Sequence, residues 1–327
     1  MIQLIVKDGL GNQLFQYAYT RFLQYLYCEK KVMEQIAINP YFIQHTEFKD
    51  NDKRDMAIHH FYLNDNVLFL DKEEQIEGMK KFRRRCLFAT PLSELYRWRI
   101  KKQKIDTEKT FKYRGERGLY YTYSSCTDYP SPLSKASDKF VFGFFQTENN
   151  FLPIADVIRK ELKVKDIPSK ENVNMIKLIQ SVNAVCLHIR RGDYLNSRWK
   201  MLQICTFEYY NNAINIVLEK VENPVFFVFS NTHSDLEWIR ENYHFRDNRG
   251  NREIKLVYVD LANPDYEELR LMYSCKHFII SNSTFSWWGA WLSDNLNKIV
   301  CAPERWNLAI DNDYKIYCEN WIKVKTH

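Results

Sequence analysis

The stretch AVCLHIRRGDY, residues 184–194, contains the pattern from which the fold can be predicted. Its first half is nearly all apolar, as in a strand that is buried on both faces, and two arginines, a glycine and an acid follow at once. Similar apolar runs alternate with helical patterns as far as residue 302. The expected strands are 184–189, 225–229, 254–259, 277–280 and 298–302, and the expected helices are 206–219, 235–242, 266–275 and 285–296. This alternation predicts a parallel, doubly wound α/β sheet, which binds ligands at the carboxyl ends of its strands.

The N-terminal half begins with the same kinds of element. Its expected elements are a strand at 2–6, a helix at 13–27, a strand at 140–145 and a helix at 155–162. Asn12 is expected to be the N-cap of the first helix. Residues 51–139 are polar, basic and weakly periodic, which indicates an inserted helical region. We therefore expect two α/β domains, 1–165 and 166–327, with a cleft between them.

The composition is that of an ordered protein. The chain has 327 residues, 45% of them hydrophobic and 15% aromatic, which excludes a disordered or low-complexity chain. No apolar run reaches the roughly 18 residues of a membrane span, and the N-terminus lacks the pattern of a signal peptide. The eight cysteines are scattered without a C-x-x-C pair, which favours reduced thiols. These features predict a cytoplasmic location.

The net charge of +6 is concentrated in one segment. Residues 80–104 contain ten basic residues and a single acid, Glu94, so the segment carries +9 and the rest of the chain −3. Apolar residues are interspersed among the basic ones, which would suit a pair of amphipathic helices at the inner face of an anionic membrane. A phosphate-bearing substrate could be attracted as well, and the alternative is a solvated helical face. No nucleic-acid-binding module accompanies the segment, so no nucleic-acid partner is expected.

The charged end of the stretch at 184–194 is the first candidate site. Arg190 and Arg191 follow a buried strand, where a guanidinium faces the ligand edge of the sheet and can bind a phosphate with two hydrogen bonds. A diphosphate leaving group needs such a fixed positive charge. The structural alternative is an ion pair, for example of Arg191 with Asp193.

A second candidate site lies at residues 279–292. There a strand ends, four small polar residues follow, and a helix begins at about Phe285. The N-terminus of a helix attracts anions through its free N–H groups and its dipole. Ser283 and Thr284 could therefore contact the same diphosphate as Arg190. The structural alternative is an N-cap followed by a core helix, which is the preferred interpretation for the tryptophans of this helix.

Together with a glycine turn near the N-terminus, these motifs resemble glycosyltransferase family 11, the inverting α1,2-fucosyltransferases, in their soluble bacterial form. The blocks of the family appear here as DGLGNQLFQYA at 8–18, GFFQTE at 143–148, HIRRGDY at 188–194 and SNSTFSWWGAWL at 281–292. The resemblance covers nearly the whole chain and implies a GT-B fold, with an acceptor-side N-terminal domain and a Rossmann-like C-terminal domain that binds GDP-fucose. It also implies transfer of L-fucose to the 2-hydroxyl of a terminal β-galactoside, in the biosynthesis of a surface polysaccharide, without a metal or other cofactor.

Roles for single residues follow from the motifs and the resemblance. Arg190 is expected to stabilise the departing diphosphate. Asp193 and Glu148 are the two candidates for the base that takes the proton of the acceptor hydroxyl. The expected donor-binding residues are Gly11, Asn12, His188, Arg190, Arg191, Asn282, Ser283, Thr284 and Phe285. Two D-x-D patterns, at 50–52 and 311–313, lie in polar loops and are interpreted as solvated turns, so no metal site is expected.

Three features depart from the family. Asp8 replaces the first glycine of the N-terminal block, and Asn231 stands where the family often has an acid, although Asp235 follows nearby. The basic region at 51–139 matches no family signature, so the acceptor, which could be a lipid-linked glycan, stays open. Two alternative functions remain: the same fold with another donor or acceptor sugar, and a non-catalytic glycan- or lipid-binding protein of a polysaccharide assembly complex.

Overall fold

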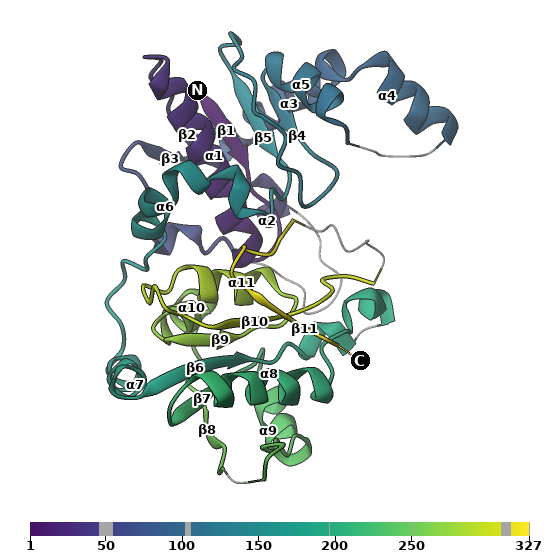
Figure 1. Cartoon of the computed structure of the whole chain (residues 1–327). Coiled ribbons are helices and arrows are strands. Elements are labelled where there is room, and N and C mark those ends of the chain that lie inside the picture. Colours follow the sequence, from purple (N-terminus) through teal and green to yellow (C-terminus); the bar gives the residue numbers. More distant parts are fainter. Residues whose placement is uncertain (46–54, 102–105, 196, 251, 309–314, 327) are drawn as a thin grey trace. The chain divides into compact units, whose positions relative to one another are not determined.

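The computed structural model describes residues 1–45, 55–101, 106–195, 197–250, 252–308 and 315–326. The chain forms two compact units, unit 1 (Met1–Leu162) and unit 2 (Lys163–His327), as drawn in Figure 1. Each unit contains one parallel sheet with helices packed against it. The prediction of two parallel α/β halves is confirmed.

The sheet of unit 2 has six strands in the order β11-β10-β9-β6-β7-β8, and every neighbouring pair is parallel. Its strands are β6 (Asn183–His188), β7 (Pro224–Phe229), β8 (Lys255–Tyr258), β9 (His277–Ile279), β10 (Val300–Pro303) and β11 (Ile322–Val324). Its helices are α7 (Lys170–Ser181), α8 (Phe207–Lys220), α9 (His233–Asn242), α10 (Asp265–Tyr273) and α11 (Thr284–Trp291). The first five strands lie where the sequence predicts them, whereas β11 was not expected. Helix α11 ends at Trp291, before the expected residue 296, and just beyond it the hydroxyl of Ser293 donates to the carbonyl oxygen of Cys275.

The strand order of unit 2 reverses at β6. The chain places β7 and β8 on one side of β6 and then returns to the other side with β9. Leu187 of β6 pairs with Ile279 of β9, so the carboxyl ends of these two strands lie side by side. Such a reversal of strand order is a switch point, where doubly wound sheets bind ligands.

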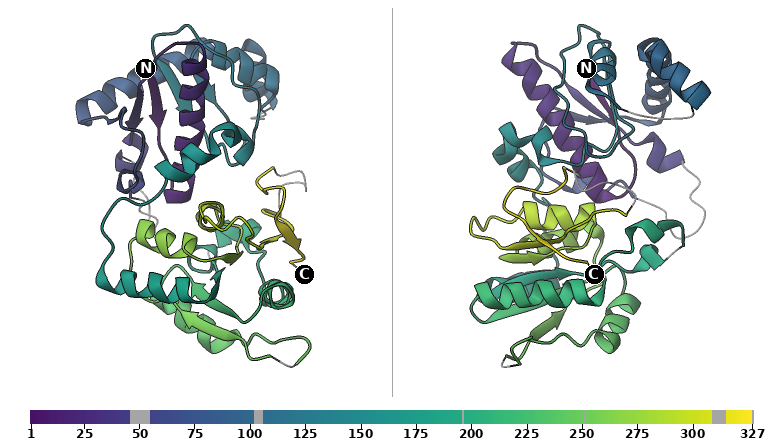
Figure 2. Two further views of the ribbon diagram at one scale, coloured as in Figure 1. Left: turned by 60° about the vertical axis from the view of Figure 1, so that its left-hand side comes forward. Right: turned by 45° about the vertical axis from the view of Figure 1, so that its right-hand side comes forward.

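The sheet of unit 1 has five parallel strands in the order β3-β2-β1-β5-β4. Its strands are β1 (Ile2–Ile5), β2 (Ile36–Asn39), β3 (Val67–Phe69), β4 (Leu119–Tyr121) and β5 (Lys139–Phe142). Its helices are α1 (Leu10–Glu29), α2 (Tyr41–His45), α3 (Lys72–Ala89), α4 (Leu92–Tyr96), the π-helical segment η2 (Arg97–Lys101), α5 (Glu108–Glu116) and α6 (Ala155–Glu161). Figure 2 shows α1 lying along the strands of this sheet.

Two expectations for unit 1 are corrected. Helix α1 begins at Leu10 with Gly9 as its N-cap, so Asn12 lies inside the first turn and is not the cap. The region at 51–139 contains the helices α3, α4 and α5, but it also supplies the edge strands β3 and β4 to the sheet. Each of these strands has three residues, which is too short for a periodic pattern in the sequence.

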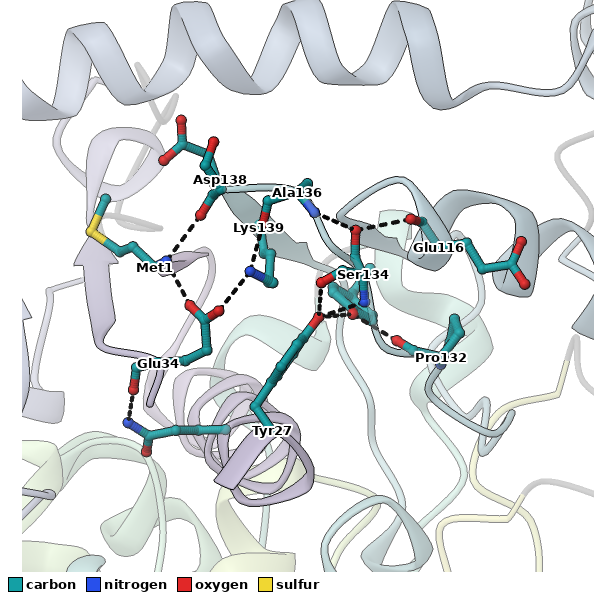
Figure 3. A network of polar contacts seen from close by, with 12 residues as sticks. Met1, Tyr27, Glu34, Glu116, Pro132, Ser134, Ala136, Asp138 and Lys139 are labelled. Carbon is teal, nitrogen blue, oxygen red and sulfur yellow. Dashed lines mark hydrogen bonds and ion pairs between the residues drawn. The ribbon is translucent and has the colours of Figure 1, made fainter. Parts of the chain in front are cut away.

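A polar network closes the amino end of the unit 1 sheet (Figure 3). Lys139, at the start of β5, donates to Glu34 over 2.7 Å and to the carbonyl oxygen of Ala136 over 2.6 Å. Both partners of the Lys139–Glu34 pair are more than nine-tenths buried. Burial opposes the charge of Glu34, but hydrogen bonds from Lys139 and the amino group of Met1 prevail and lower its pKa. Because ligands bind at the opposite, carboxyl edge of such sheets, we assign this network to stability.

Candidate functional site

The candidate site of unit 2 is built on the carboxyl ends of β6 and β9. His188 ends β6 and is 2% exposed, and its Nδ1 lies 3.2 Å from the hydroxyl oxygen of Ser281, which follows β9. The backbone N–H of Ser281 donates to the hydroxyl of Ser286 inside α11 over 3.2 Å. These two contacts join the two strand ends and the first turn of α11 into one rigid group.

His188 is uncharged in this environment. Burial, and next the charge of Arg190, lower the pKa of His188 to about 3. Its ring also lies near the ring of Phe285, with centroids 6.0 Å apart. A neutral imidazole can hold a hydroxyl or accept a weak hydrogen bond, but it does not supply a proton at neutral pH.

Arg190 lies against the amide of Asn231 and the ring of Tyr194. With the amide of Asn231 turned so that its oxygen faces the guanidinium, Nη1 and Nε of Arg190 donate to it over 3.0 and 3.3 Å. The guanidinium also lies over the ring of Tyr194, 5.4 Å from its centroid. Asn231 is the position at which the chain departs from the family's acid. An acid there would add a negative charge beside Arg190, whereas the amide is neutral.

Arg191 is held differently from its neighbour. Its guanidinium lies 3.3 Å from the centroid of the Trp238 ring, and its Nε lies 3.6 Å from Oδ1 of Asp235. These contacts hold the guanidinium of Arg191 within the protein, and the expected ion pair of Arg191 with Asp193 involves a side chain outside the described residues. Gly192 permits the close approach, because a Cβ there would lie 3.2 Å from Asn231 and 3.3 Å from Asp235.

The segment from Ser281 to the start of α11 is largely buried. The Asn282 side chain donates to the carbonyl oxygens of Leu202 and Trp306 over 2.9 and 3.0 Å, so both of its N–H groups are used to hold neighbouring loops. Ser283 is the N-cap of α11, but its side chain makes no capping hydrogen bond. The first backbone N–H groups of a helix have no partner within it, so this terminus can bind an anion. Thr284 and Phe285, which begin the helix, are partly exposed beside it.

Sequence reasoning missed Glu268 of α10. Burial, and next the charge of Asp265, raise the pKa of Glu268 to about 8, although the charge of Arg190 opposes this. Nothing in the sequence distinguishes this acid from Glu267, which pairs with Arg270 over 3.0 Å. Only the fold separates the acid whose pKa is shifted from the acid that pairs within its own helix.

The expected residues of unit 1 gather at the carboxyl edge of its sheet. The side-chain oxygen of Asn12 accepts a hydrogen bond of 2.7 Å from Gln146, which joins the N-terminal block to the block at 143–148. Gly11 is buried in the first turn of α1. Glu148 begins the short 3₁₀ segment η3 (Glu148–Asn150) at the same edge and is partly exposed. The side chain of Asp193, the other candidate base, lies outside the described residues.

Two residues at this edge, Lys7 and Asp8, have properties that only the structure shows: a shifted pKa and a left-handed backbone conformation. Burial lowers the pKa of Lys7 to about 8, although the charge of Asp8 opposes this, and its ammonium lies over the rings of Phe142 and Phe144, 4.4 and 3.9 Å from their centroids. Asp8 adopts φ = 70°, the left-handed region that favours glycine, and its carboxylate accepts a 2.8 Å hydrogen bond from the N–H of Gly9. The substitution thus keeps the turn of the family's glycine block at some cost in strain.

The described residues form neither a metal-ligand cluster nor a membrane-spanning helix. Within the part of the chain that the structure describes, no three His, Cys, Asp or Glu side chains are grouped as metal ligands would be. The D-x-D patterns at 50–52 and 311–313 lie outside the described residues. Among the helices that are described, none is both long and apolar enough to cross a membrane.

Comparisons with known proteins give the following similarities. The family model described as Glycosyl transferase family 11 matches residues 1–325. An α-1,2-colitosyltransferase of Escherichia coli is 33% identical over 58% of this chain and 64% of its own length. The O-antigen biosynthesis glycosyltransferase WbnK of Escherichia coli is 26% identical over 98% of this chain and 99% of its own length. A galactoside α-(1,2)-fucosyltransferase 1 of Saimiri boliviensis boliviensis is 26% identical over 44% of this chain and 40% of its own length.

Solved structures also match, at lower identity. The crystal structure of the fucosyltransferase NodZ from Bradyrhizobium covers 88% of this chain and 91% of its own, with 11% identity and a TM-score of 0.46.

Proposed function

This chain belongs to glycosyltransferase family 11, and we propose that it transfers L-fucose from GDP-fucose, with inversion, to the 2-hydroxyl of a terminal β-galactoside in a glycan. The observation that carries the proposal is the position of Arg190, which follows β6 at the switch point of unit 2, where α11 also begins after the neighbouring strand β9. The names of two relatives, an α-1,2-colitosyltransferase and a galactoside α-(1,2)-fucosyltransferase, support the α1,2 linkage.

The reaction requires three contributions from the protein. The acceptor hydroxyl attacks the anomeric carbon, a base takes its proton, and the bond to the diphosphate oxygen breaks. Arg190 and the first N–H groups of α11 would stabilise the negative charge that develops on GDP, where fixed donors typically contribute a few kcal/mol each. Ser283 and Thr284 would add hydroxyl donors at the same place. His188 stays neutral and positions the loop through Ser281.

We propose that the base is a carboxylate, that of either Asp193 after β6 or Glu148 in unit 1. Replacing each acid by its amide separates the two, because the base variant loses turnover while keeping affinity for GDP. We propose further that transfer needs no metal ion or other cofactor. The acceptor is proposed to be a galactose-terminated glycan, which can be lipid-linked, and the site of action the inner face of the cell membrane.

The decisive experiment uses the purified chain with GDP-fucose, lactose or N-acetyllactosamine, and EDTA. We expect a fucosylated product whose linkage is α1,2 by NMR. Activity that disappears with EDTA and returns with Mn²⁺ would contradict the metal-independent reaction. Absence of both a product and a GDP-dependent rise in the melting temperature would contradict the donor assignment and support a non-catalytic protein.

A second donor is favoured by one comparison. The relative that is 33% identical is named for the transfer of colitose, which is L-fucose without one hydroxyl group. The same assay with GDP-colitose therefore accompanies the assay with GDP-fucose. A higher kcat/KM for GDP-colitose would keep the proposed α1,2 chemistry and correct the sugar.

A further inference from the structure

One surface of unit 1 exposes an unusual number of large apolar side chains. It is formed by the C-terminal half of α3, by α4 and by the π-helical segment η2, and we name it the α3–α4 surface. Its apolar residues are Leu87, Phe88, Leu92, Tyr96, Trp98 and Ile100. Their exposed fractions lie between 58% for Trp98 and 84% for Leu92. Figure 1 shows α4 at one end of unit 1, beyond α5 and β4 as seen from β1. Soluble surfaces rarely gather apolar side chains in this way without a binding partner.

Exposed cations accompany these apolar side chains. Arg83 and Arg84 of α3, and Arg99 and Lys101 of η2, make no ion pair among the described residues. Their charges are therefore available to an external anionic partner. Trp and Tyr with interspersed Lys and Arg are typical of segments that lie at a lipid–water interface, with rings at the headgroup level and cations at the phosphates.

The one acid of residues 80–104 is turned away from this surface. Glu94 is 4% exposed and accepts a hydrogen bond of 3.0 Å from Arg114 of α5, which also donates to Asp106 over 2.8 Å. This buried triad fixes α4 to the rest of unit 1. Because Glu94 points inward, the α3–α4 surface keeps its positive charge, and α4 keeps its apolar side chains outward.

We propose that the α3–α4 surface docks unit 1 onto an anionic lipid bilayer. The rings and aliphatic chains enter the headgroup region, and Arg83, Arg84, Arg99 and Lys101 bind lipid phosphates. Both observations fit this partner: an apolar interface alone would suit a second protein, whereas a cationic face without apolar residues would suit any polyanion. The proposal does not depend on the donor or acceptor sugar, and it places an acceptor-side unit where a lipid-linked glycan would be found.

The electrostatic part is tested by sedimentation with vesicles of phosphatidylcholine alone and of phosphatidylcholine with phosphatidylglycerol. We expect the wild type to bind the anionic vesicles and to be released by salt. Each basic residue near an anionic surface contributes about fivefold in affinity, so Arg83→Gln with Arg84→Gln should weaken binding roughly 25-fold. The matched control is Lys165→Gln with Lys177→Gln, exposed lysines of unit 2, which should change it less than about twofold.

The apolar part is tested with Leu87→Ser and Phe88→Ser together, and the control is Ile167→Ser with Leu296→Ser, two exposed apolar residues of unit 2. The surface variant should lose more than about tenfold in vesicle affinity and the control little. The fluorescence of Trp98 should shift to the blue on binding and should be quenched by brominated lipid. Unchanged melting temperatures and unchanged transfer to soluble lactose show that the variants fold.

Three results would overturn the proposal. One is equal binding of the wild type to neutral and anionic vesicles. Another is an equal effect of the surface variants and the unit 2 controls. The third is a dimer in solution that the surface variants dissociate while vesicles bind neither protein, which would assign the surface to a second copy of the chain.

Discussion

Arg190 and Arg191 are adjacent in sequence, yet their surroundings predict opposite results when each is replaced by alanine. The guanidinium of Arg190 donates to the amide oxygen of Asn231, and we propose that it also binds the diphosphate of the donor. The guanidinium of Arg191 is stacked on Trp238 and paired with Asp235. We expect Arg190→Ala to weaken GDP binding and Arg191→Ala to lower the free energy of unfolding.

The magnitudes follow from these contacts. A hydrogen bond to a charged group contributes about 1.5–3 kcal/mol, so losing the Arg190 contact to a diphosphate should weaken GDP binding roughly 10- to 150-fold. Arg191 loses a cation–π contact and a partly exposed ion pair, which together contribute about 1–2 kcal/mol to the free energy of unfolding.

Two measurements on each variant test this separation. Titration calorimetry with GDP gives the affinity, and urea unfolding gives the stability. Arg190→Lys keeps the charge but loses the planar fork, so its affinity should lie between those of the wild type and Arg190→Ala. Equal losses of GDP affinity in Arg190→Ala and Arg191→Ala would refute the reasoning, and so would normal GDP affinity in Arg190→Ala.

Three further predictions concern strain, titration and burial. The free energy of unfolding of Asp8→Gly should exceed that of Asp8→Ala by about 1 kcal/mol. Glycine adopts the left-handed φ without strain, whereas alanine keeps the strain and loses the hydrogen bond to Gly9. Equal stabilities of the two variants in urea unfolding would contradict this. The raised pKa of Glu268 means that the folded state binds a proton that the unfolded state releases between pH 4.5 and about 8, so stability is lost as pH rises through this window. Glu268→Gln should therefore gain stability relative to the wild type from pH 5 to pH 8, and a constant difference in unfolding curves at the two pH values would exclude the shifted titration. Lys139→Met leaves Glu34 with the amino group of Met1 as a remaining cationic partner, so it should cost roughly 1–3 kcal/mol in urea unfolding with GDP affinity unchanged, and an unchanged stability would show that the pair is replaceable.

The sequence predicts much of unit 2 because the central strands of this unit have recognisable patterns. Strands β6 and β7 are continuous apolar runs buried on both faces, and the helices between strands begin at hydroxyl residues such as Thr206 and Thr232, which cap them. Strand β11 has three residues and pairs only with β10, so no local pattern marks it. The same holds for β3 and β4 in unit 1, which are recognisable only through their neighbours in the sheet.

The sequence also predicts which loops form the candidate site, but it does not predict which partner each side chain of these loops contacts. Arg190 and Arg191 look alike in the chain, and their different partners come from the loop after β7 and from α9, about forty residues further on. Lys7 and Glu268 acquire their shifted pKa values from burial and from neighbours that only the fold supplies. Local sequence therefore identifies the edge of a sheet that binds a ligand, whereas the division of labour between neighbouring residues is a tertiary property.

The two departures from the family, Asp8 and Asn231, affect different properties of the protein. Asp8 keeps the backbone conformation of a glycine, so its effect falls on the strain and stability of the turn in unit 1. Asn231 keeps the shape of an acid but carries no charge beside Arg190, so its effect falls on the electrostatic field at the proposed donor site of unit 2. Asn231→Asp would add a negative charge beside Arg190, which should reduce the attraction for GDP most strongly at low salt. We therefore expect the first substitution to affect folding and the second to affect donor binding.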